Sequence, residues 1–228
     1  MQKNALASLN HTHNNSQGLY VENLLPEYYF YEKEGGKLSL VVVLPEDSSG
    51  NELARFMQQE ASKSKEKYGF EPATNLFKNT LRTVVSREFH WDARMSIVYI
   101  TRDGDFLEIL SAGNIWAGLF RGGHLVNCTG NDQARTLGEE GPDGFISKLS
   151  MVHSLSFQNW TQNWSTQNGD LLVITGADTH HSLKEIIEIA MDTAHISGAP
   201  VSQILSNVHP YLNSGQVKAK MMAVIQFS

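Results

Sequence analysis

Hydrophobic and polar residues alternate along several stretches of the chain, and turn residues such as Gly and Asp separate these stretches. Alternation with a period of two is typical of β-strands. Strands are expected over 18–31, 37–44, 95–101, 106–111, 115–120, 124–128, 149–157, 171–175 and 221–227. The turn at Glu34-Gly35-Gly36 predicts a hairpin between the first two strands, and the closely spaced turns between 95 and 128 predict an antiparallel meander.

Helices are expected over 49–67, 73–87, 183–196 and 201–212. Ser49 and Glu52 form a capping-box pattern at the start of the first helix, in which each side chain caps a free backbone N–H group. The apolar positions at helical spacing in the first two helices are Leu53, Phe56, Met57, Ala61, Leu76, Phe77, Leu81, Val84 and Val85. Because strands and helices are grouped rather than alternating as β-α-β units, the order predicts an α+β layered fold.

Composition narrows the class of protein. The chain has 228 residues, of which 41% are hydrophobic and 18% charged, with a net charge of −6. These values are typical of a globular protein and exclude a disordered chain. The mild acidity also argues against a nucleic-acid-binding protein, which would carry a basic patch. The single cysteine, Cys128, excludes an intramolecular disulfide and a multi-cysteine zinc site.

Neither a membrane span nor a signal peptide is predicted. The longest aliphatic run covers only 38–44, whereas a membrane helix needs about 20 apolar residues. Residues 1–17 are polar, without periodicity or an apolar core. We therefore expect a cytoplasmic protein that binds neither nucleic acid nor a membrane, with a flexible polar tail at 1–17 and a single domain at 18–228.

Several segments carry a family likeness. Residues 110–123, LSAGNIWAGLFRGG, contain a Gly-Asn turn between two strands, and residues 169–175, GDLLVIT, form a strand after Gly-Asp. Gly18 and Asn23 fit an opening Gly…Asn pattern. In this order the segments resemble the metal-dependent protein phosphatases of the 2C type, most closely the short bacterial members that act in stress and sporulation signalling. The resemblance implies a protein phosphatase 2C-like layered β-sandwich flanked by helices, with two metal ions at one end.

The metal-binding positions that the resemblance implies do not follow the family pattern. Mg²⁺ and Mn²⁺ prefer carboxylate and water oxygens, so the family's reaction needs aspartates from several loops. The implied ligand positions carry Leu24, Leu25, Pro45, Ala177 and Ala219, and Lys220 follows the last of them. Tyr20 replaces an arginine that often contacts phosphate in the family.

These departures indicate a catalytically inactive pseudophosphatase without a metal centre. Such a protein would keep the fold as a scaffold and bind a regulatory protein or phosphoprotein. On this interpretation the chain has no catalytic residue and needs no cofactor.

The alternative is a divergent but active phosphoserine/phosphothreonine phosphatase that depends on Mg²⁺ or Mn²⁺. Its reduced metal site would use Glu46, Asp47 and Asp178, which lie next to the substituted positions. A structural explanation competes with this one. Glu46 and Asp47 also suit the positive end of a helix, and Asp178 suits a helix N-cap.

A third possibility places the function at two tryptophans. Residues 158–164, QNWTQNW, are expected to connect two strands, so Trp160 and Trp164 could form an exposed binding patch. The equally weighted alternative is that both rings pack against the edge of the sandwich.

Overall fold

The computed structural model describes residues 19–23, 29–34, 36–45, 50–85, 95–113, 115–129, 161–177, 185, 187–193 and 219–227. The chain divides into two compact units. The first unit comprises Met1–Pro26, Trp116–Cys128 and Gln167–Ser228, and the second comprises Glu27–Ile115 and Thr129–Thr166. Each unit is built around one five-stranded sheet.

Sheet B forms the framework of the second unit. Its strands, in spatial order, are β2 (Tyr29–Glu34), β3 (Lys37–Pro45), β4 (Met95–Asp103), β5 (Phe106–Ala112) and β8 (Thr161–Ser165), and neighbours pair antiparallel. In β3, residues 38–44 are all buried. All of them except Ser39 are apolar, as expected for a strand with both faces buried.

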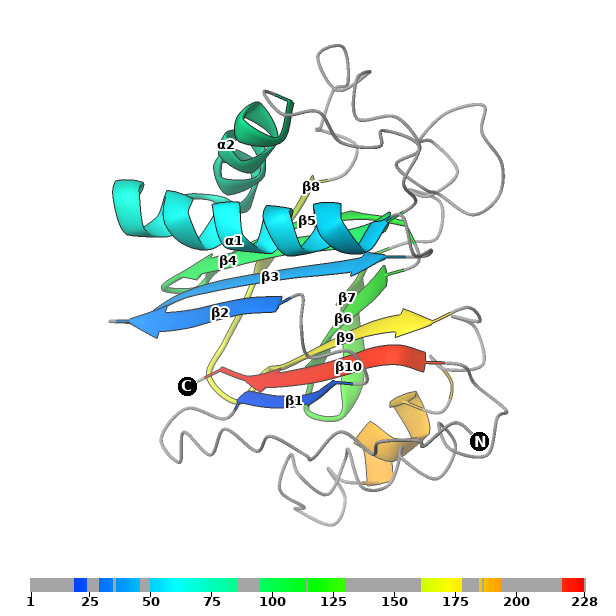
Figure 1. The fold of residues 1–228 in the computed structure, drawn as a ribbon. Coiled ribbons are helices and arrows are strands. Elements are labelled where there is room, and N and C mark those ends of the chain that lie inside the picture. Colours follow the sequence, from blue (N-terminus) through cyan, green and yellow to red (C-terminus); the bar gives the residue numbers. More distant parts are fainter. Residues whose placement is uncertain are drawn as a thin grey trace, which may run out of the picture. The chain divides into compact units, whose positions relative to one another are not determined.

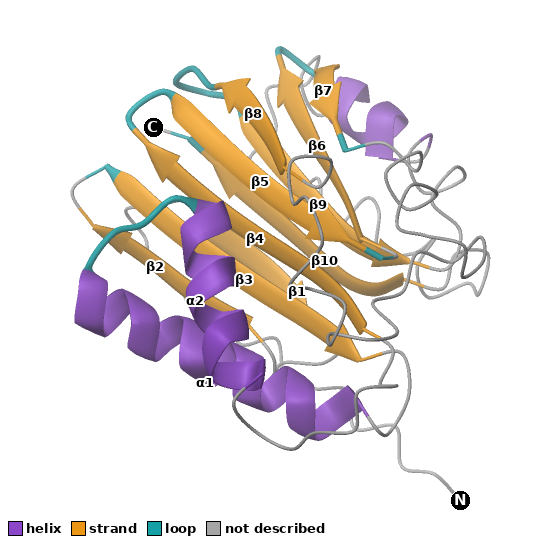
Figure 2. Cartoon of the chain, turned by 90° about the horizontal axis from the view of Figure 1, so that it is seen from above, coloured by secondary structure: helices purple, strands orange, loops and turns teal. Residues whose placement is uncertain are grey.

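Helices α1 (Gly50–Tyr68) and α2 (Ala73–Val85) lie on the same face of sheet B (Figures 1 and 2). Glu52 in the first turn of α1 and Lys65 and Lys67 in its last turn match the helix dipole. The apolar helix faces form one buried cluster with the sheet, made of Val41, Val43, Leu53, Ala54, Phe56, Met57, Ala61, Ala73, Leu76, Phe77, Leu81, Val84, Ile97, Tyr99, Leu110 and Ala112. Within it, Phe77 and Tyr99 pack edge to face, with 5.0 Å between ring centroids.

A buried carboxylate joins α2 to the sheet. Thr74, in the first turn of α2, donates a hydrogen bond from Oγ1 to Oε1 of Glu108 on β5 at 2.6 Å. The first turn of α2 contains no acidic residue of its own. Glu108 therefore brings a negative charge from another element to the positive end of the helix, where it is stabilising.

Sheet A forms the framework of the first unit. Its strands, in spatial order, are β1 (Leu19–Asn23), β10 (Ala219–Gln226), β9 (Leu171–Ala177), β6 (Ile115–Arg121) and β7 (His124–Cys128). A helical segment at 187–193, orange in Figure 1, belongs to the same unit and buries Ile187, Ala190 and Met191. None of the described helices is long and apolar enough to cross a membrane.

The predicted helices at 49–67 and 73–87 are confirmed as α1 and α2, and most predicted strands are confirmed with shifts of one or two residues. The predicted tail at 1–17, the strand at 149–157 and the helix at 201–212 lie outside the described residues.

Three predictions are wrong. Residues 18–31 form two strands in different sheets rather than one, with Pro26, which has no backbone N–H for a ladder, between them. The expected meander over 95–128 consists of two hairpins, β4–β5 and β6–β7, which also belong to different sheets. Finally, 161–165 is strand β8, where a connection was expected.

Gly113 lies where the chain leaves sheet B for sheet A. Its φ is +86°, a left-handed conformation that glycine adopts readily. A Cβ at this position would lie 2.8 Å from the Cα of Ser96. The backbone therefore passes close to β4 at Gly113, and β5 and β6, which flank this position, belong to different sheets rather than to one hairpin.

Candidate functional site

The ends of three strands meet at one end of sheet A. Asn23, the last residue of β1, pairs with Met221 of β10. Ala177, the last residue of β9, pairs with Ala219, the first residue of β10. Because the pairings are antiparallel, segments far apart in the sequence are brought together here. We call this end of the sheet, with Asn23, Ala177, Ala219 and Lys220, the β9–β10 end.

Lys220 lies in an irregularity of β10. The register runs from Ala219↔Ala177 directly to Met221↔Gly176, so Lys220 is the extra residue of a β-bulge. A bulge bends its strand and changes the direction in which its residues project. Lys220 is also the only charged residue of β10, whose sequence is AKMMAVIQ.

The β9–β10 end contains several of the positions that the family resemblance singled out. Ala177, Ala219 and Lys220 were predicted to occupy ligand positions or their neighbours, and the register brings them together with Asn23. Pro45, another such position, ends β3 in the second unit.

The three acidic candidates Glu46, Asp47 and Asp178 lie outside the described residues. In the sequence, Glu46 follows the last residue of β3, and Asp178 follows the last residue of β9. Among the described residues, no three His, Cys, Asp or Glu side chains form a group that could hold a metal ion.

Trp164 is a buried residue of strand β8. Its side chain is 7% exposed, and its Nε1 donates a hydrogen bond to Oε1 of Gln162 at 3.1 Å. The strand exists because it pairs with β5, with Trp164 opposite Leu107. Trp160 lies outside the described residues. Trp164 is therefore placed as a packing residue, and its indole N–H is satisfied within the strand.

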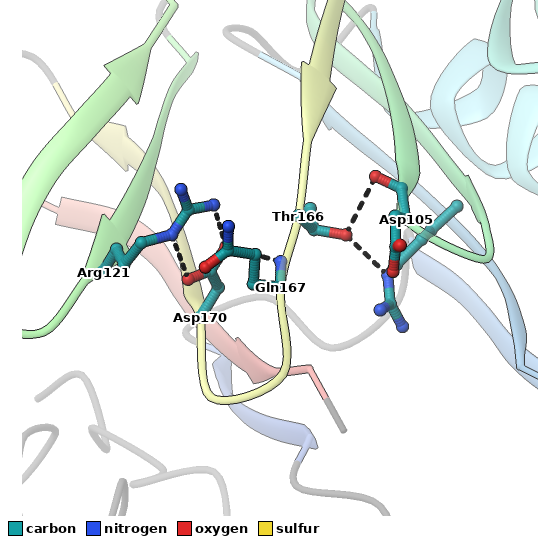
Figure 3. A network of polar contacts seen from close by, with 6 residues as sticks. Asp105, Arg121, Thr166, Gln167 and Asp170 are labelled. Carbon is teal, nitrogen blue, oxygen red and sulfur yellow. Dashed lines mark hydrogen bonds and ion pairs between the residues drawn. The ribbon is translucent and has the colours of Figure 1, made fainter.

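A cluster of polar side chains lies in the first unit, at the start of β9. Asp170 is 1% exposed and accepts two hydrogen bonds from Arg121 of β6, Nε to Oδ1 at 2.9 Å and Nη2 to Oδ2 at 2.8 Å (Figure 3). The backbone N–H of Gln167 also donates to Oδ2, at 2.8 Å. The hydrogen bonds that Arg121 donates to Asp170 are the main cause that raises the pKa of Arg121, although desolvation opposes the shift.

The same turn also anchors the last strand. The backbone N–H of Phe227 donates to the carbonyl of Asp170 at 2.9 Å, and that of Gly169 donates to the carbonyl of Phe227 at 2.8 Å. With all these bonds in place, Asp170 holds the turn and the end of β10 rather than offering a reactive carboxylate. The sequence marked Gly169-Asp170 only as part of a motif, and nothing in it indicated the distant partner Arg121.

A separate set of contacts fixes the end of β8 in the second unit. Thr166 donates from Oγ1 to the carbonyl of Asp105 at 3.2 Å and accepts from Nε of Arg102 at 3.0 Å (Figure 3). Arg102 is 4% exposed. These bonds satisfy polar groups at the β4–β5 turn and have no evident catalytic geometry.

The comparisons with known proteins concern the fold. No protein-family model and no curated protein matches the sequence. Among solved structures, RsbX in complex with magnesium is 15% identical, with a TM-score of 0.57 over 92% of this chain and 94% of that one. The SiaA-PP2C domain of Pseudomonas aeruginosa is 12% identical, with a TM-score of 0.57 over 93% of this chain and 81% of that one.

A third similar structure is the catalytic domain of the serine threonine protein phosphatase PstP in complex with two manganese ions. It is 13% identical, with a TM-score of 0.51 over 91% of this chain and 95% of that one. The identities are low, so these matches establish the architecture and nothing about activity. They confirm the expected α+β class and the resemblance stated from the sequence: the chain has the fold of the PP2C-type protein phosphatases.

Proposed function

We propose that this protein is a pseudophosphatase with the PP2C fold, a cytoplasmic signalling protein that acts as one domain over 18–228. In this proposal it binds a regulatory protein or a phosphoprotein and does not hydrolyse phosphate esters. The observation that carries the proposal is the composition of the β9–β10 end, where Ala177, Ala219 and Lys220 meet and none of them has a carboxylate.

The chemistry of metal-dependent phosphate hydrolysis explains why this composition matters. RsbX and PstP have been solved with magnesium and with manganese ions, respectively. Such hard ions are held by carboxylates, and a pair of them activates a water molecule and neutralises phosphate charge. An alanine methyl group cannot coordinate a cation, and the positive charge of Lys220 disfavours one nearby. This combination supports binding without hydrolysis.

The test is a calorimetric titration of Mn²⁺ into the chelator-treated full chain, together with a phosphatase assay on a phosphoserine peptide with and without Mn²⁺. We expect no binding heat, no change in melting temperature and no Mn²⁺-dependent release of phosphate. A metal that bound the folded state would raise the melting temperature, so the two measurements check each other.

The divergent-phosphatase alternative predicts the opposite result. Asp178 follows Ala177 directly in the sequence. Mn²⁺-dependent hydrolysis that is lost in Asp178→Asn would overturn the pseudophosphatase proposal. The matched control is Asp192→Asn, a substitution of an exposed carboxylate in the 187–193 helix, which should leave any such activity unchanged.

A further inference from the structure

Residues 167–170 form a tight turn that contains an Asn-Gly pair. The backbone N–H of Asp170 donates to the carbonyl of Gln167 at 3.1 Å, which closes a β-turn with Asn168 and Gly169 at its two central positions. Gly169 has a φ of +88°, as the third residue of a type II turn requires. Both central residues are exposed, and they form the only Asn-Gly pair of the sequence.

An asparagine followed by glycine reacts spontaneously with its own backbone. The glycine nitrogen, after losing its proton, attacks the side-chain carbonyl carbon of the asparagine, so that a C–N bond forms and ammonia leaves. Water then opens the cyclic imide at one of its two carbonyl groups and leaves aspartate or isoaspartate. Glycine favours this ring closure because it has no side chain to crowd the attacking nitrogen. Water is the only co-reactant, and ammonia is the only group released.

The folded chain holds the attacking nitrogen in a hydrogen bond. The N–H of Gly169 donates to the carbonyl of Phe227 at 2.8 Å, and the N–H of Phe227 donates to the carbonyl of Asp170 at 2.9 Å. Figure 3 shows this turn, in yellow, beside the red end of β10. Phe227 is 2% exposed, so its buried ring keeps the end of β10 in place. A hydrogen-bonded N–H loses its proton mainly during local opening, so ring closure must wait for this contact to break.

We infer that Asn168 is a site of spontaneous deamidation whose rate is controlled by the contact between Gly169 and Phe227. The reaction takes place in molecules in which the end of β10 has separated from the turn. Its product alters the turn, because the new carboxylate lies two residues from the buried carboxylate of Asp170 and isoaspartate lengthens the backbone. The inference concerns residues that the pseudophosphatase proposal does not use.

The experiment incubates the full chain at mildly alkaline pH and follows deamidation by peptide mass spectrometry, with fragmentation that distinguishes isoaspartate from aspartate. A synthetic peptide of residues 163–173 gives the rate without the fold. We expect Asn168 to react at least about tenfold more slowly in the folded chain than in the peptide, because only the locally open molecules react. Asn168→Gln, whose longer side chain closes a ring far more slowly, should abolish the modification at this position.

Two variants separate local opening from global unfolding. Phe227→Ala removes the buried ring that anchors the end of β10 and should raise the rate at Asn168 by about tenfold or more. Amide hydrogen exchange at Gly169 should rise by a similar factor, since both processes need the same opening. Leu76→Ala is the matched control, because it truncates a buried side chain of the second unit and should leave the rate within about twofold. If Phe227→Ala does not fold, Phe227→Leu should give a smaller increase of about threefold.

The inference is supported by deamidation that is fastest at Asn168, slower in the folded chain than in the peptide, and accelerated by the substitutions at Phe227 but not by Leu76→Ala. It is overturned if the folded chain reacts as fast as the peptide, if Leu76→Ala accelerates the reaction equally, or if Asn168 stays unmodified in the unaltered chain and in the Phe227 variants. None of these measurements involves metal or phosphate, so every one of these results leaves the pseudophosphatase proposal to its own test.

Discussion

At the scale of single residues, Gly118 shows how closely the core of the first unit is packed. A Cβ at this position of β6 would clash with Cη2 of Trp116 and would lie 2.7 Å from its Cζ2. The Cδ1 atom of Leu125, on β7, would be 3.0 Å away. Trp116 is 5% exposed and cannot swing into solvent without leaving the core. A side chain at 118 therefore has no space.

We expect Gly118→Ala to lower the free energy of unfolding by about 1–3 kcal/mol, the usual cost of overpacking a core. Urea unfolding followed by tryptophan fluorescence measures it. The double variant Trp116→Phe with Gly118→Ala removes the clashing ring atoms and should lose less stability than the two single changes added together. Strict additivity of the two changes would contradict this explanation.

Tyr99 is a second residue whose effect on stability can be measured, because that effect depends on pH. Its ring is fully buried, and burial raises the pKa of the phenol above its usual value of 10.0. The folded chain therefore keeps this proton at a pH where the unfolded chain has lost it. The stabilisation is complete below about pH 10 and decreases as the pH rises further.

We expect Tyr99→Phe to reduce the alkaline loss of stability by up to about 1.4 kcal/mol per pH unit above pH 10. The measurement is the free energy of unfolding between pH 8 and pH 11. Tyr68→Phe is the control, since Tyr68 is 55% exposed and should keep the slope of the unaltered chain. Equal slopes in the two variants would show that Tyr99 does not titrate in this way.

At the scale of elements, the turn between β8 and β9 depends on one carboxylate. Asp170 accepts the two bonds from Arg121 and one from Gln167, and its backbone holds Phe227. The two strands that end and begin here, β10 and β9, also form the β9–β10 end at their other termini. The turn therefore helps to set the register on which the candidate site depends.

We expect Asp170→Asn to destabilise the protein by about 2–3 kcal/mol. The substitution removes the negative charge that pairs with Arg121, and it leaves the buried N–H of Gln167 with a weaker acceptor. In Asp170→Asn, the substitution should accelerate amide hydrogen exchange at Phe227 more than at the centre of β4. Asp103→Asn is the matched control: it breaks an exposed ion pair with Lys37 and should cost about 0.5 kcal/mol or less. Equal losses in the two variants would contradict this role of Asp170.

At the scale of the whole molecule, local pattern predicted most elements but not their assembly into sheets. The helices at 50–68 and 73–85 and the hairpin strands followed from periodicity and turn residues. Whether β6 continues beside β5 or enters the other sheet depends on long-range pairing. Alternation is the same in both cases, so the sequence could not distinguish a four-stranded meander from two separate hairpins.

For the candidate site, too, the sequence supplied the residue types and the tertiary structure supplied their arrangement. The resemblance drew attention to Ala177, Ala219 and Lys220 individually, because the residue types at those positions are unsuited to holding metal ions. Their position opposite one another, and the bulge that separates Lys220 from the ladder, follow only from the β9–β10 register. The pairing of Arg121 with Asp170, 49 residues apart, was likewise unpredictable from local pattern.

The sequence by itself determined the α+β class, the two long amphipathic helices and the absence of carboxylates at the positions that meet at the β9–β10 end. These properties depend on residue type and on spacing over a few residues, so they can be inferred from each segment of the sequence separately. The tertiary structure alone decided which strands share a sheet, that Asp170 pairs with Arg121, and that Lys220 lies between the residues of β10 that pair with Ala177 and Gly176. Those outcomes depend on backbone hydrogen bonds and buried contacts between segments far apart in the chain, which form only when the whole chain folds.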